Sequence, residues 1–213
     1  MSGEDVARVL LEMKAVSLNT SKPFRYTSGM LSPIYCDNRL LLSNPEKREL
    51  VVDRFIESVT KNKISFDVVA GVATAGIPHA AFISQKLSKP MIYVRAEKKG
   101  HGKHNAIEGG LERGQKVLVI EDHISTGGSS VAAVNAIKEA GGKVDFCLAI
   151  TTYELDSAKK AFEEATCKAL TLTDLSTIIS VAEKMGYLTK EDGRKIIQWK
   201  KDPQGWGKSM GFE

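Results

Sequence analysis

Residues 116–130, KVLVIEDHISTGGSS, constrain the fold of this chain more than any other stretch. They open with four apolar residues, 117–120, a pattern typical of a strand in a parallel sheet that is covered on both faces. Glu121 and Asp122 stand at the carboxyl end of this strand, and a loop of hydroxyls and glycines follows. Beyond the loop, apolar residues recur at helical spacing until the Gly-Gly pair at 141–142. The stretch therefore predicts a strand, a loop and a helix of an α/β fold.

The loop that follows the acid pair has the composition of an anion site. In an open α/β sheet, ligands bind beyond the carboxyl ends of the strands, where a helix amino terminus presents unpaired N–H groups. Glycines let these amides approach phosphate oxygens, and hydroxyls add donors. The acid pair would repel a phosphate, so we interpret it as facing a sugar diol or its bound cation. The alternative is that the glycines only form a tight turn.

This combination resembles the signature of the type I phosphoribosyltransferases, namely four apolar residues, two acids, two variable residues and Thr/Ser-Thr-Gly-Gly-Ser/Thr. The resemblance implies an α/β fold with a central, mostly parallel sheet flanked by helices and a small N-terminal hood. It also implies that the loop holds the 5-phosphate of phosphoribosyl pyrophosphate (PRPP), while the acids bind the ribose 2- and 3-hydroxyls, with Asp122 in a catalytic role. The PRPP-binding residues implied here are Glu121, Asp122, His123, Ile124, Ser125, Thr126, Gly127, Gly128 and Ser129.

Composition is ordinary for a single globular domain of 213 residues, with 42% hydrophobic and 26% charged residues. No apolar run approaches the roughly 20 residues needed to cross a bilayer, so no membrane association is expected. The chain starts with acids where a secretory signal carries bases, which favours the cytoplasm. The net charge of +4 is mild and its basic residues are scattered, so nucleic acid is not an expected partner.

Three cysteines, Cys36, Cys147 and Cys167, are odd in number and widely spaced. This spacing suggests neither a disulfide framework nor a zinc site. We expect the cysteines to be small core residues.

The first forty residues predict an appendage that precedes the α/β body. An apolar stripe over 5–18 predicts an amphipathic helix. Short β-prone pieces then alternate with turn residues over 24–39, which predicts a small hairpin-like structure whose simplest role is to cover the core.

The pattern Phe-x-x-x-Ser-Gly-x-x-Ser-Pro-x-Tyr, which starts at Phe24, is similar to the branch of the family that acts on orotate. In that branch this segment forms the hood, here mainly 1–40, over the pyrimidine. The resemblance implies contacts to the orotate ring from main-chain groups at Tyr35 and Cys36 and from Ser125.

A second loop of small residues lies between a short buried strand at 67–70 and a helix at 80–87. Such a loop suggests another anion site, although a tight βα turn explains it equally. The resemblance places pyrophosphate against the main-chain amides of Ala73, Thr74, Ala75 and Gly76.

After a strand at 91–94, residues 95–106 combine basic side chains, histidines and glycines without apolar periodicity. This composition predicts a mobile, solvated loop. The resemblance implies more, because Arg95, Lys99 and His101 match the family's Arg…Lys-x-His pattern for a catalytic lid whose cations reach the pyrophosphate. In that interpretation the lid excludes water and Lys99 or His101 donates a proton.

The rest of the chain predicts further elements of the α/β body. Strands are expected at 106–110, 144–151 and 169–172, and helices at 45–60, 155–164, 174–184 and 189–200, before a turn-rich tail. His79 is expected to start a helix as a satisfied structural histidine.

The resemblance as a whole implies Mg²⁺-dependent transfer of a ribosyl 5-phosphate from PRPP to orotate, in UMP biosynthesis. The Mg²⁺ ion would bind mainly through substrate oxygens, without a metal cage built by the protein. The enzyme would be a homodimer whose 95–106 loop acts on the neighbour's site.

Two alternatives remain at this stage. A phosphoribosyltransferase for a purine or uracil should lack the 24–39 segment, and a non-catalytic PRPP-sensing regulator would need an added DNA-binding domain.

Overall fold

The computed structural model describes residues 3–26, 28–95 and 106–212. Its centre is a six-stranded sheet in the order β10-β9-β8-β5-β6-β7, in which only β7 is antiparallel to its neighbour. This arrangement confirms the predicted α/β fold with a mostly parallel sheet. The strands are β5 (Val68–Val72), β6 (Met91–Val94), β7 (Ile107–Glu108), β8 (Lys116–Ile124), β9 (Lys143–Thr152) and β10 (Lys168–Thr171).

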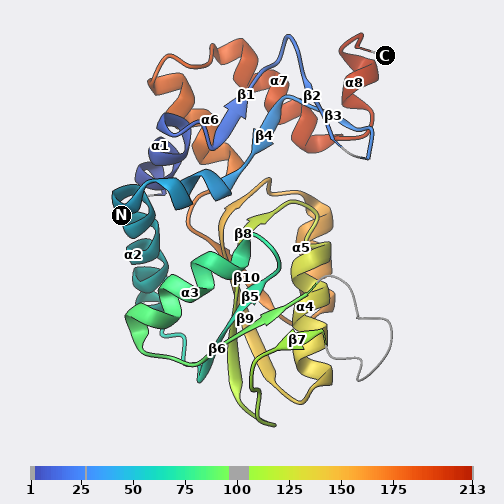
Figure 1. Ribbon diagram of the computed structural model, residues 1–213. Coiled ribbons are helices and arrows are strands. Elements are labelled where there is room, and N and C mark those ends of the chain that lie inside the picture. Colours follow the sequence, from blue (N-terminus) through green and yellow to red (C-terminus); the bar gives the residue numbers. More distant parts are fainter. Residues whose placement is uncertain (1–2, 27, 96–105, 213) are drawn as a thin grey trace.

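Helices cover both faces of this sheet (Figure 1). One face packs against α1 (Glu4–Glu12), α2 (Pro45–Lys61) and α3 (Gly76–Leu87), and the other against α4 (Gly128–Glu139) and α5 (Asp156–Glu164). Each face has its own cluster of buried hydrophobic residues, as expected for a sheet whose central strands are apolar throughout.

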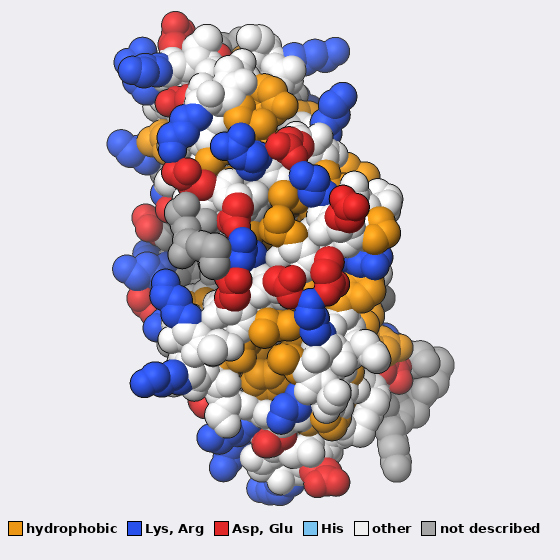
Figure 2. Space-filling view, turned by 90° about the vertical axis from the view of Figure 1, so that its left-hand side faces the viewer, with side chains coloured by type: hydrophobic (Ala, Val, Ile, Leu, Met, Phe, Trp, Pro, Cys, Tyr) orange, Lys and Arg blue, Asp and Glu red, His pale blue; other side chains and the backbone are white. Residues whose placement is uncertain are grey.

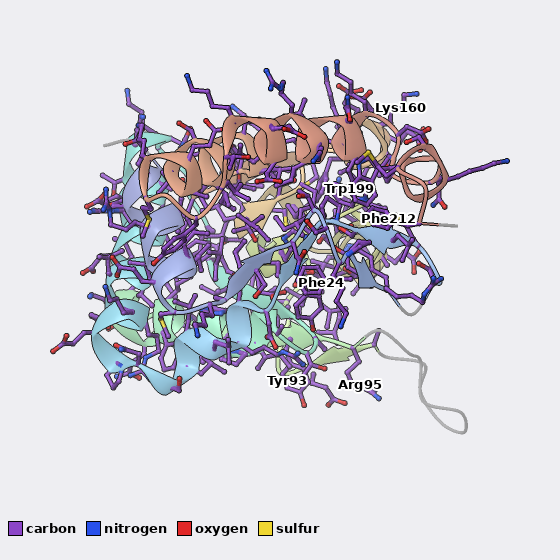
Figure 3. The ribbon with its side chains drawn as sticks, turned by 90° about the horizontal axis from the view of Figure 1, so that it is seen from above. Phe24, Tyr93, Arg95, Lys160, Trp199 and Phe212 are labelled. Carbon is purple, nitrogen blue, oxygen red and sulfur yellow. The ribbon has the colours of Figure 1, made fainter. Side chains whose placement is uncertain are left out.

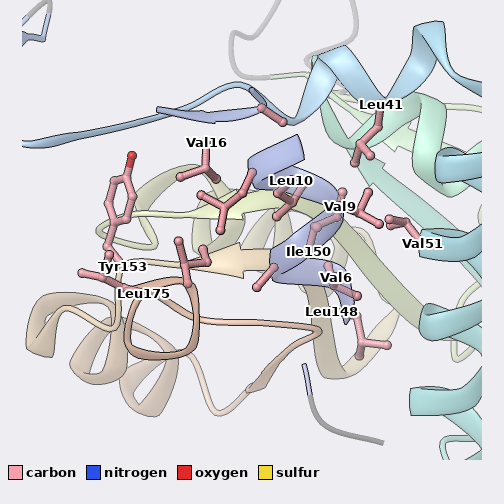
Figure 4. Packing of buried hydrophobic residues seen from close by; sticks show 14 of the residues in the cluster. Val6, Val9, Leu10, Val16, Leu41, Val51, Leu148, Ile150, Tyr153 and Leu175 are labelled. Atoms are coloured by element: carbon pink, nitrogen blue, oxygen red, sulfur yellow. The ribbon is translucent and has the colours of Figure 1, made fainter. Parts of the chain in front are cut away.

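The larger cluster joins the amino-terminal helix to the middle of the sheet (Figure 4). Val6 and Leu10 of α1 belong to it together with Leu148 and Ile150 of β9, and all four are almost fully buried. Burial of each such side chain contributes roughly 1.5–3 kcal/mol. This packing fixes β9, and with it the neighbouring β8, against the amino-terminal segment.

The hood consists of two small antiparallel pairs above the sheet. β1 (Val16–Leu18) pairs with β4 (Ile34–Cys36), and β2 (Phe24–Arg25) pairs with β3 (Leu31–Ser32). A 3₁₀ helix, η1 (Asn38–Ser43), then leads from the hood into α2. The short β pieces predicted over 24–39 are therefore confirmed.

The C-terminal helices lie beside the hood, at the top of Figure 1, and are part of the same packing unit. They are α6 (Leu175–Lys184), α7 (Lys190–Lys201) and α8 (Trp206–Ser209). The indole nitrogen of Trp199 donates to the main-chain oxygen of Leu31, at 3.1 Å. Trp206 is also buried, so the predicted turn-rich tail in fact carries a short helix that packs against the body.

The helix predicted over 5–18 is wrong in its second half. Helix α1 ends at Glu12, Lys14 has a left-handed backbone with φ of 56°, and β1 begins at Val16. The apolar residues at 15 and 16 are buried because this segment pairs with β4, a partner that local periodicity does not reveal.

Several other boundaries also move. Strand β8 continues through the acid pair to Ile124, so the two acids lie within the last residues of the strand rather than after it. Helix α3 begins at Gly76, four residues before the predicted start, and β5 extends to Val72. The helices predicted at 45–60, 155–164, 174–184 and 189–200 are confirmed to within one residue at each end.

The face that lies on the left in Figure 1 is shown in Figure 2, where basic and acidic side chains alternate with small hydrophobic areas. The basic residues are thus scattered on this face, as the sequence suggests. Among the described residues, no helix is both long and apolar enough to span a membrane.

Candidate active site

The acid pair lies at the carboxyl end of the central strand β8. The side chain of Glu121 is almost completely buried and faces the first turn of α4. Its Oε2 accepts a hydrogen bond from the Ser130 hydroxyl at 3.1 Å, with the Ser129 hydroxyl at 3.4 Å. Its Oε1 accepts from the main-chain N–H of Asp122 at 3.1 Å. Glu121 is therefore fixed to the helix that follows the loop, while Asp122 stands beside it.

Burial makes this pair unusual in its protonation. Loss of solvent, together with the neighbouring charge of Asp122, raises the pKa of Glu121 to about 8. Desolvation also raises the pKa of Asp122. Desolvation acts on both carboxyl groups and the charge of Asp122 adds to the rise at Glu121, whereas the hydrogen bond from Glu121 lowers the pKa of Asp122. The site therefore accommodates a ligand that supplies hydroxyl donors or positive charge.

The loop predicted to bind phosphate leads directly into α4. Gly127 has a positive φ of 83° and precedes the first residue of the helix, Gly128. A Cβ atom at Gly127 would lie 3.4 Å from both the Ala158 Cα and the Phe162 ring, so this position also requires a close approach to α5. The result is a loop whose backbone bends onto a helix amino terminus, where N–H groups are free to bind an anion. Ser125 and Thr126 lie in the same loop.

The second predicted loop meets the same strand. A Cβ atom at Gly76 would lie 2.5 Å from the Ile120 carbonyl oxygen and 3.2 Å from the Glu121 Cα, so the first residue of α3 packs directly on β8. The Ala73 amide donates to the Val94 carbonyl at 2.9 Å, which ties the loop to β6. Thr74 and Ala75 complete the loop. The structure thus brings the two predicted anion loops together on either side of Glu121.

The two variable positions of the signature are a half-buried histidine and a buried isoleucine. His123 packs edge-on against Tyr153, with ring centroids 4.1 Å apart, and its Nδ1 lies 2.8 Å from the Thr151 hydroxyl. Burial lowers the pKa of His123 to about 4, so the ring is neutral. Ile124 is 2% exposed and belongs to the core. Any contact of Ile124 with a ligand must therefore come mainly from the main chain.

The predicted orotate contacts lie on strand β4 of the hood. Tyr35 is 42% exposed and lies near Phe24, with ring centroids 5.8 Å apart. Cys36 is half-buried rather than fully inside the core, in contrast to Cys147 and Cys167, which are buried as predicted. In the view of Figure 3, Phe24 lies between Trp199 of α7 and the end of β6. The hood therefore offers an aromatic surface above the sheet edge.

Asn38 is a residue of this site that the sequence did not indicate. It follows the hood strand β4, is fully buried, and its Nδ2 donates to the main-chain carbonyl of Asp122 at 2.8 Å. An asparagine next to a turn usually caps a helix or bonds to its own backbone, so the local sequence gave no signal of this long-range contact.

Arg95 lies where β6 ends (Figure 3). Its guanidinium forms a salt bridge with Glu108 at 3.0 Å, and its amide donates to the Ala106 carbonyl at 2.8 Å. These contacts join the two ends of the predicted lid. Lys99 and His101 lie outside the described residues.

The prediction for His79 is wrong in two respects. The residue lies in the first turn of α3 rather than at its start, and although it is fully buried, neither ring nitrogen has a hydrogen-bond partner among the described residues. Burial lowers the pKa of His79 to about 4. A neutral ring, packed as an apolar group, accounts for its place in the core.

A family model described as the phosphoribosyl transferase domain matches residues 41–188, and the chain belongs to this family. Full-length relatives place it more narrowly. It is 50% identical over 202 residues to the orotate phosphoribosyltransferase of Coxiella burnetii, covering 95% of this chain and 97% of the relative. It is 52% identical over 205 residues to that of Listeria innocua, covering 96% and 98%. The chain is thus a member of the orotate phosphoribosyltransferases, which are glycosyltransferases.

Solved structures agree with this assignment. The orotate phosphoribosyltransferase of Aeropyrum pernix superposes with a TM-score of 0.75 at 29% identity, covering 86% of this chain and 99% of that one. The UMP synthase of Leishmania donovani gives a TM-score of 0.78 at 27% identity, covering 93% of this chain but only 43% of that longer one. The predicted fold, hood included, is therefore the fold of this family.

Proposed function

We propose that this enzyme transfers the ribosyl 5-phosphate group of PRPP to orotate, forming orotidine 5′-monophosphate and pyrophosphate in UMP biosynthesis. One observation carries the proposal. Glu121 and Asp122 lie side by side at the end of β8, between a loop at the start of α4 and the amino terminus of α3 that packs on the same strand. Two anion-binding loops around a buried acid pair match a sugar with a phosphate at each end.

The binding roles follow from this geometry. Residues 125–129, at the amino terminus of α4, hold the 5-phosphate through main-chain amides and hydroxyls. The acid pair accepts hydrogen bonds from the ribose 2- and 3-hydroxyls, and Asp122 is the more available of the two because Glu121 already accepts from Ser130. The loop at 73–76 holds the pyrophosphate through the amides of residues 74–76, since the Ala73 amide already donates to Val94 and the side chains of the loop offer no cation.

The chemistry requires charge to be stabilised on both sides of one bond. Displacement of pyrophosphate from C1 gives a transition state with oxocarbenium character, in which positive charge gathers on the ribose. The carboxylate of Asp122, fixed near the ribose, stabilises that charge where it develops. Arg95, Lys99 and His101 stabilise the departing pyrophosphate, and Lys99 or His101 protonates it.

The donor set fits Mg²⁺ held mainly through substrate oxygens. No cluster of three or more His, Cys, Asp or Glu side chains that could hold a metal ion occurs within residues 3–26, 28–95 and 106–212. A magnesium ion usually takes one or two carboxylates and completes its shell with water and phosphate oxygens, and Asp122 with Glu121 can supply these. When bound, the ion neutralises charge on the pyrophosphate group.

Orotate binds under the hood, against the main chain at Tyr35 and Cys36 and beside Ser125. Tyr35 and Phe24 supply an aromatic surface at this place, and aromatic side chains are suitable platforms for a flat pyrimidine. The ring nitrogen of orotate is acidic enough to attack without a strong base from the protein.

We also propose that the chain acts as one phosphoribosyltransferase domain in a cytoplasmic homodimer, with residues 95–106 reaching the neighbour's site. The test mixes Lys99→Ala with Asp122→Asn subunits, after dissociation and reassociation. A loop that acts in trans leaves one intact site in each hybrid dimer, which restores about a quarter of wild-type activity for a random two-fold pairing. No recovery above the unmixed variants would show that the loop acts within its own subunit.

The substrate assignment is tested by ultraviolet spectroscopy. With PRPP and Mg²⁺, the enzyme should deplete the absorbance of orotate and release pyrophosphate, and both changes should stop when a chelator is added. Uracil and hypoxanthine are the controls. Turnover of either one in place of orotate would assign the enzyme to another base, and binding of PRPP without turnover of any base would favour a PRPP sensor.

A further inference from the structure

Asn38 connects the hood to the acid pair by direct contact. It lies at the start of η1, just after β4, and its side chain is completely buried. Its Nδ2 has two partners, the main-chain carbonyl of Asp122 at 2.8 Å and the Thr151 hydroxyl at 3.0 Å. We propose that Asn38, held by Thr151, is a positioning residue that fixes Asp122 for its contact with the ribose.

The end of strand β8 needs such support. Its pairing with β5 reaches only from Val68↔Val117 to Gly71↔Ile120, whereas its pairing with β9 continues to Ile124↔Thr152. The acid pair therefore lies on a part of β8 that has a strand partner on one side only. The Asn38 amide bonds to the main chain within this part, where a buried carbonyl without a donor would cost about 1–3 kcal/mol.

Thr151 is the second member of the arrangement. Its hydroxyl, on a side chain only 1% exposed, meets Asn38 Nδ2 at 3.0 Å and His123 Nδ1 at 2.8 Å. Asn38 Nδ2 can only donate, so the Thr151 oxygen accepts from it and the Thr151 hydroxyl hydrogen can bond to the His123 nitrogen. This direction requires a neutral His123, in agreement with its lowered pKa. Cys36 Sγ completes the set by donating to Asn38 Oδ1 at 3.3 Å.

The consequence is a continuous connection from the base side to the ribose side of the site. Cys36 and Asn38 belong to the segment proposed to cover orotate, and Asp122 belongs to the strand proposed to hold the ribose. Because Asn38 is buried and hydrogen-bonded to both the hood and β8, it restricts the position of both segments. The inference deepens the proposed function and rests on it, because positioning of Asp122 matters only if Asp122 binds the ribose.

The first experiment compares Thr151→Val with Thr151→Ser in the purified full-length enzyme. Thr151→Val keeps the shape but removes the hydroxyl, and should lower kcat with orotate and PRPP by about tenfold to a hundredfold, as when a group that orients a ligand-binding side chain is lost. Thr151→Ser restores the hydroxyl and should recover most of this loss. The matched control is Thr152→Val, because the one hydrogen bond of the Thr152 hydroxyl to a described residue is accepted from the nearby Glu154 amide. Wild-type kcat in Thr151→Val would overturn the proposal.

The second experiment separates positioning from folding with a double-mutant cycle of Asn38→Ala and Asp122→Asn. If Asn38 acts through Asp122, Asn38→Ala should lower kcat about tenfold or more in the wild type and less than threefold in the Asp122→Asn background. Equal fold losses in both backgrounds would show a general structural role and overturn the proposal. Affinity for inorganic phosphate, which probes the proposed anion loops and not the ribose contacts of Asp122, should stay within twofold in Asn38→Ala, and a larger loss would also contradict the proposal.

Activity of the wild-type enzyme distinguishes failure of the proposed function from failure of the proposed role of Asn38. If it fails to consume orotate, the proposed function is wrong whatever the variants do. If it consumes orotate and the cycle is additive, the proposed function stands and the role of Asn38 is refuted.

Discussion

The two loops on either side of Glu121 use the same backbone arrangement with different side chains. Each follows a buried parallel strand and leads into a helix that begins with glycine, β5 into α3 and β8 into α4. The 125–129 loop carries three hydroxyls and follows two acids, whereas the 73–76 loop carries one hydroxyl and two alanines. The comparison suggests that the first recognises its ligand by side chains and main chain, and the second by main chain alone.

The glycines at the two helix starts also differ, because each is required for a different physical reason. Gly76 is required by packing, because a Cβ atom at this position would lie within 3.2 Å of main-chain atoms of Ile120 and Glu121. Gly127 is required by its left-handed backbone. A Cβ atom at Gly128 would meet nothing nearer than the Thr126 hydroxyl, at 3.9 Å. The α3 end is therefore a packed support for the acid strand, and the α4 end has the open space that the proposed phosphate site requires.

The largest expected effect concerns the acid pair that both loops flank. Asp122→Asn keeps the shape but removes the negative charge near the ribose, and should lower kcat by about a hundredfold or more, the range for loss of a group that stabilises transition-state charge. Steady-state kinetics with orotate and PRPP measure this. Asp145→Asn, at an exposed position near the other end of β9, is the matched control. Equal kcat values for the two variants would refute the role of Asp122.

The next effect concerns the glycines at the two helix starts. Gly76→Ala places a methyl group 2.5 Å from the Ile120 carbonyl, which cannot move away without displacing β8. Such overpacking costs about 1–3 kcal/mol and should lower Tm by roughly 3–10 °C in a chain of this size. Gly128→Ala is the control and should change Tm by less than about 2 °C. Differential scanning calorimetry measures both, and a larger loss in Gly128→Ala would reverse our distinction between the loops.

The third prediction concerns pH. Folding raises the pKa of Glu121 from its usual 4.5 to about 8, so the folded chain binds a proton that the unfolded chain has released. Stability of the free enzyme is therefore predicted to fall as pH rises from about 4.5 to about 8. Glu121→Gln should remove much of this decline and exceed the wild type in free energy of unfolding at pH 8, with little difference at pH 4.5. Denaturant titrations across this range provide the test. A wild-type stability that rises with pH in parallel with the variant would contradict the buried-pair account.

The smallest effect separates side-chain from main-chain recognition. Thr126→Val removes a hydroxyl from the first loop, and loss of one hydrogen bond to a charged phosphate should raise the KM for PRPP about tenfold. Thr74→Val makes the same change in the second loop and should alter this KM less than twofold. Equal changes in the two variants would remove the distinction between the loops.

Much of this site could be predicted from local sequence because its parts are contiguous. The strand, acid pair, loop and helix of residues 116–139 follow one another, and their periodicity and composition indicate each one directly. The two small-residue loops between strand and helix and the short strands of the hood could be predicted for the same reason. Only their boundaries moved, since a parallel strand continues as long as its neighbour offers hydrogen bonds, and β9 does so as far as Ile124.

The contacts that local sequence could not indicate are those between distant segments. The strand at 16–18 exists because it pairs with 34–36, and Asn38 is part of the site because it reaches Asp122, 84 residues away. Likewise, Trp199 and Trp206 pack near the hood from the far end of the chain. Such contacts depend on the tertiary arrangement and leave no periodic pattern in the sequence.

The most direct test is a crystal structure of the enzyme soaked with PRPP and Mg²⁺. We predict that the 5-phosphate will lie against the amides of residues 126–129 and that the ribose 2- and 3-hydroxyls will donate to Asp122 and Glu121. The pyrophosphate should lie against the amides of residues 74–76. A PRPP molecule bound elsewhere, with the acid pair free of the ribose, would contradict the account.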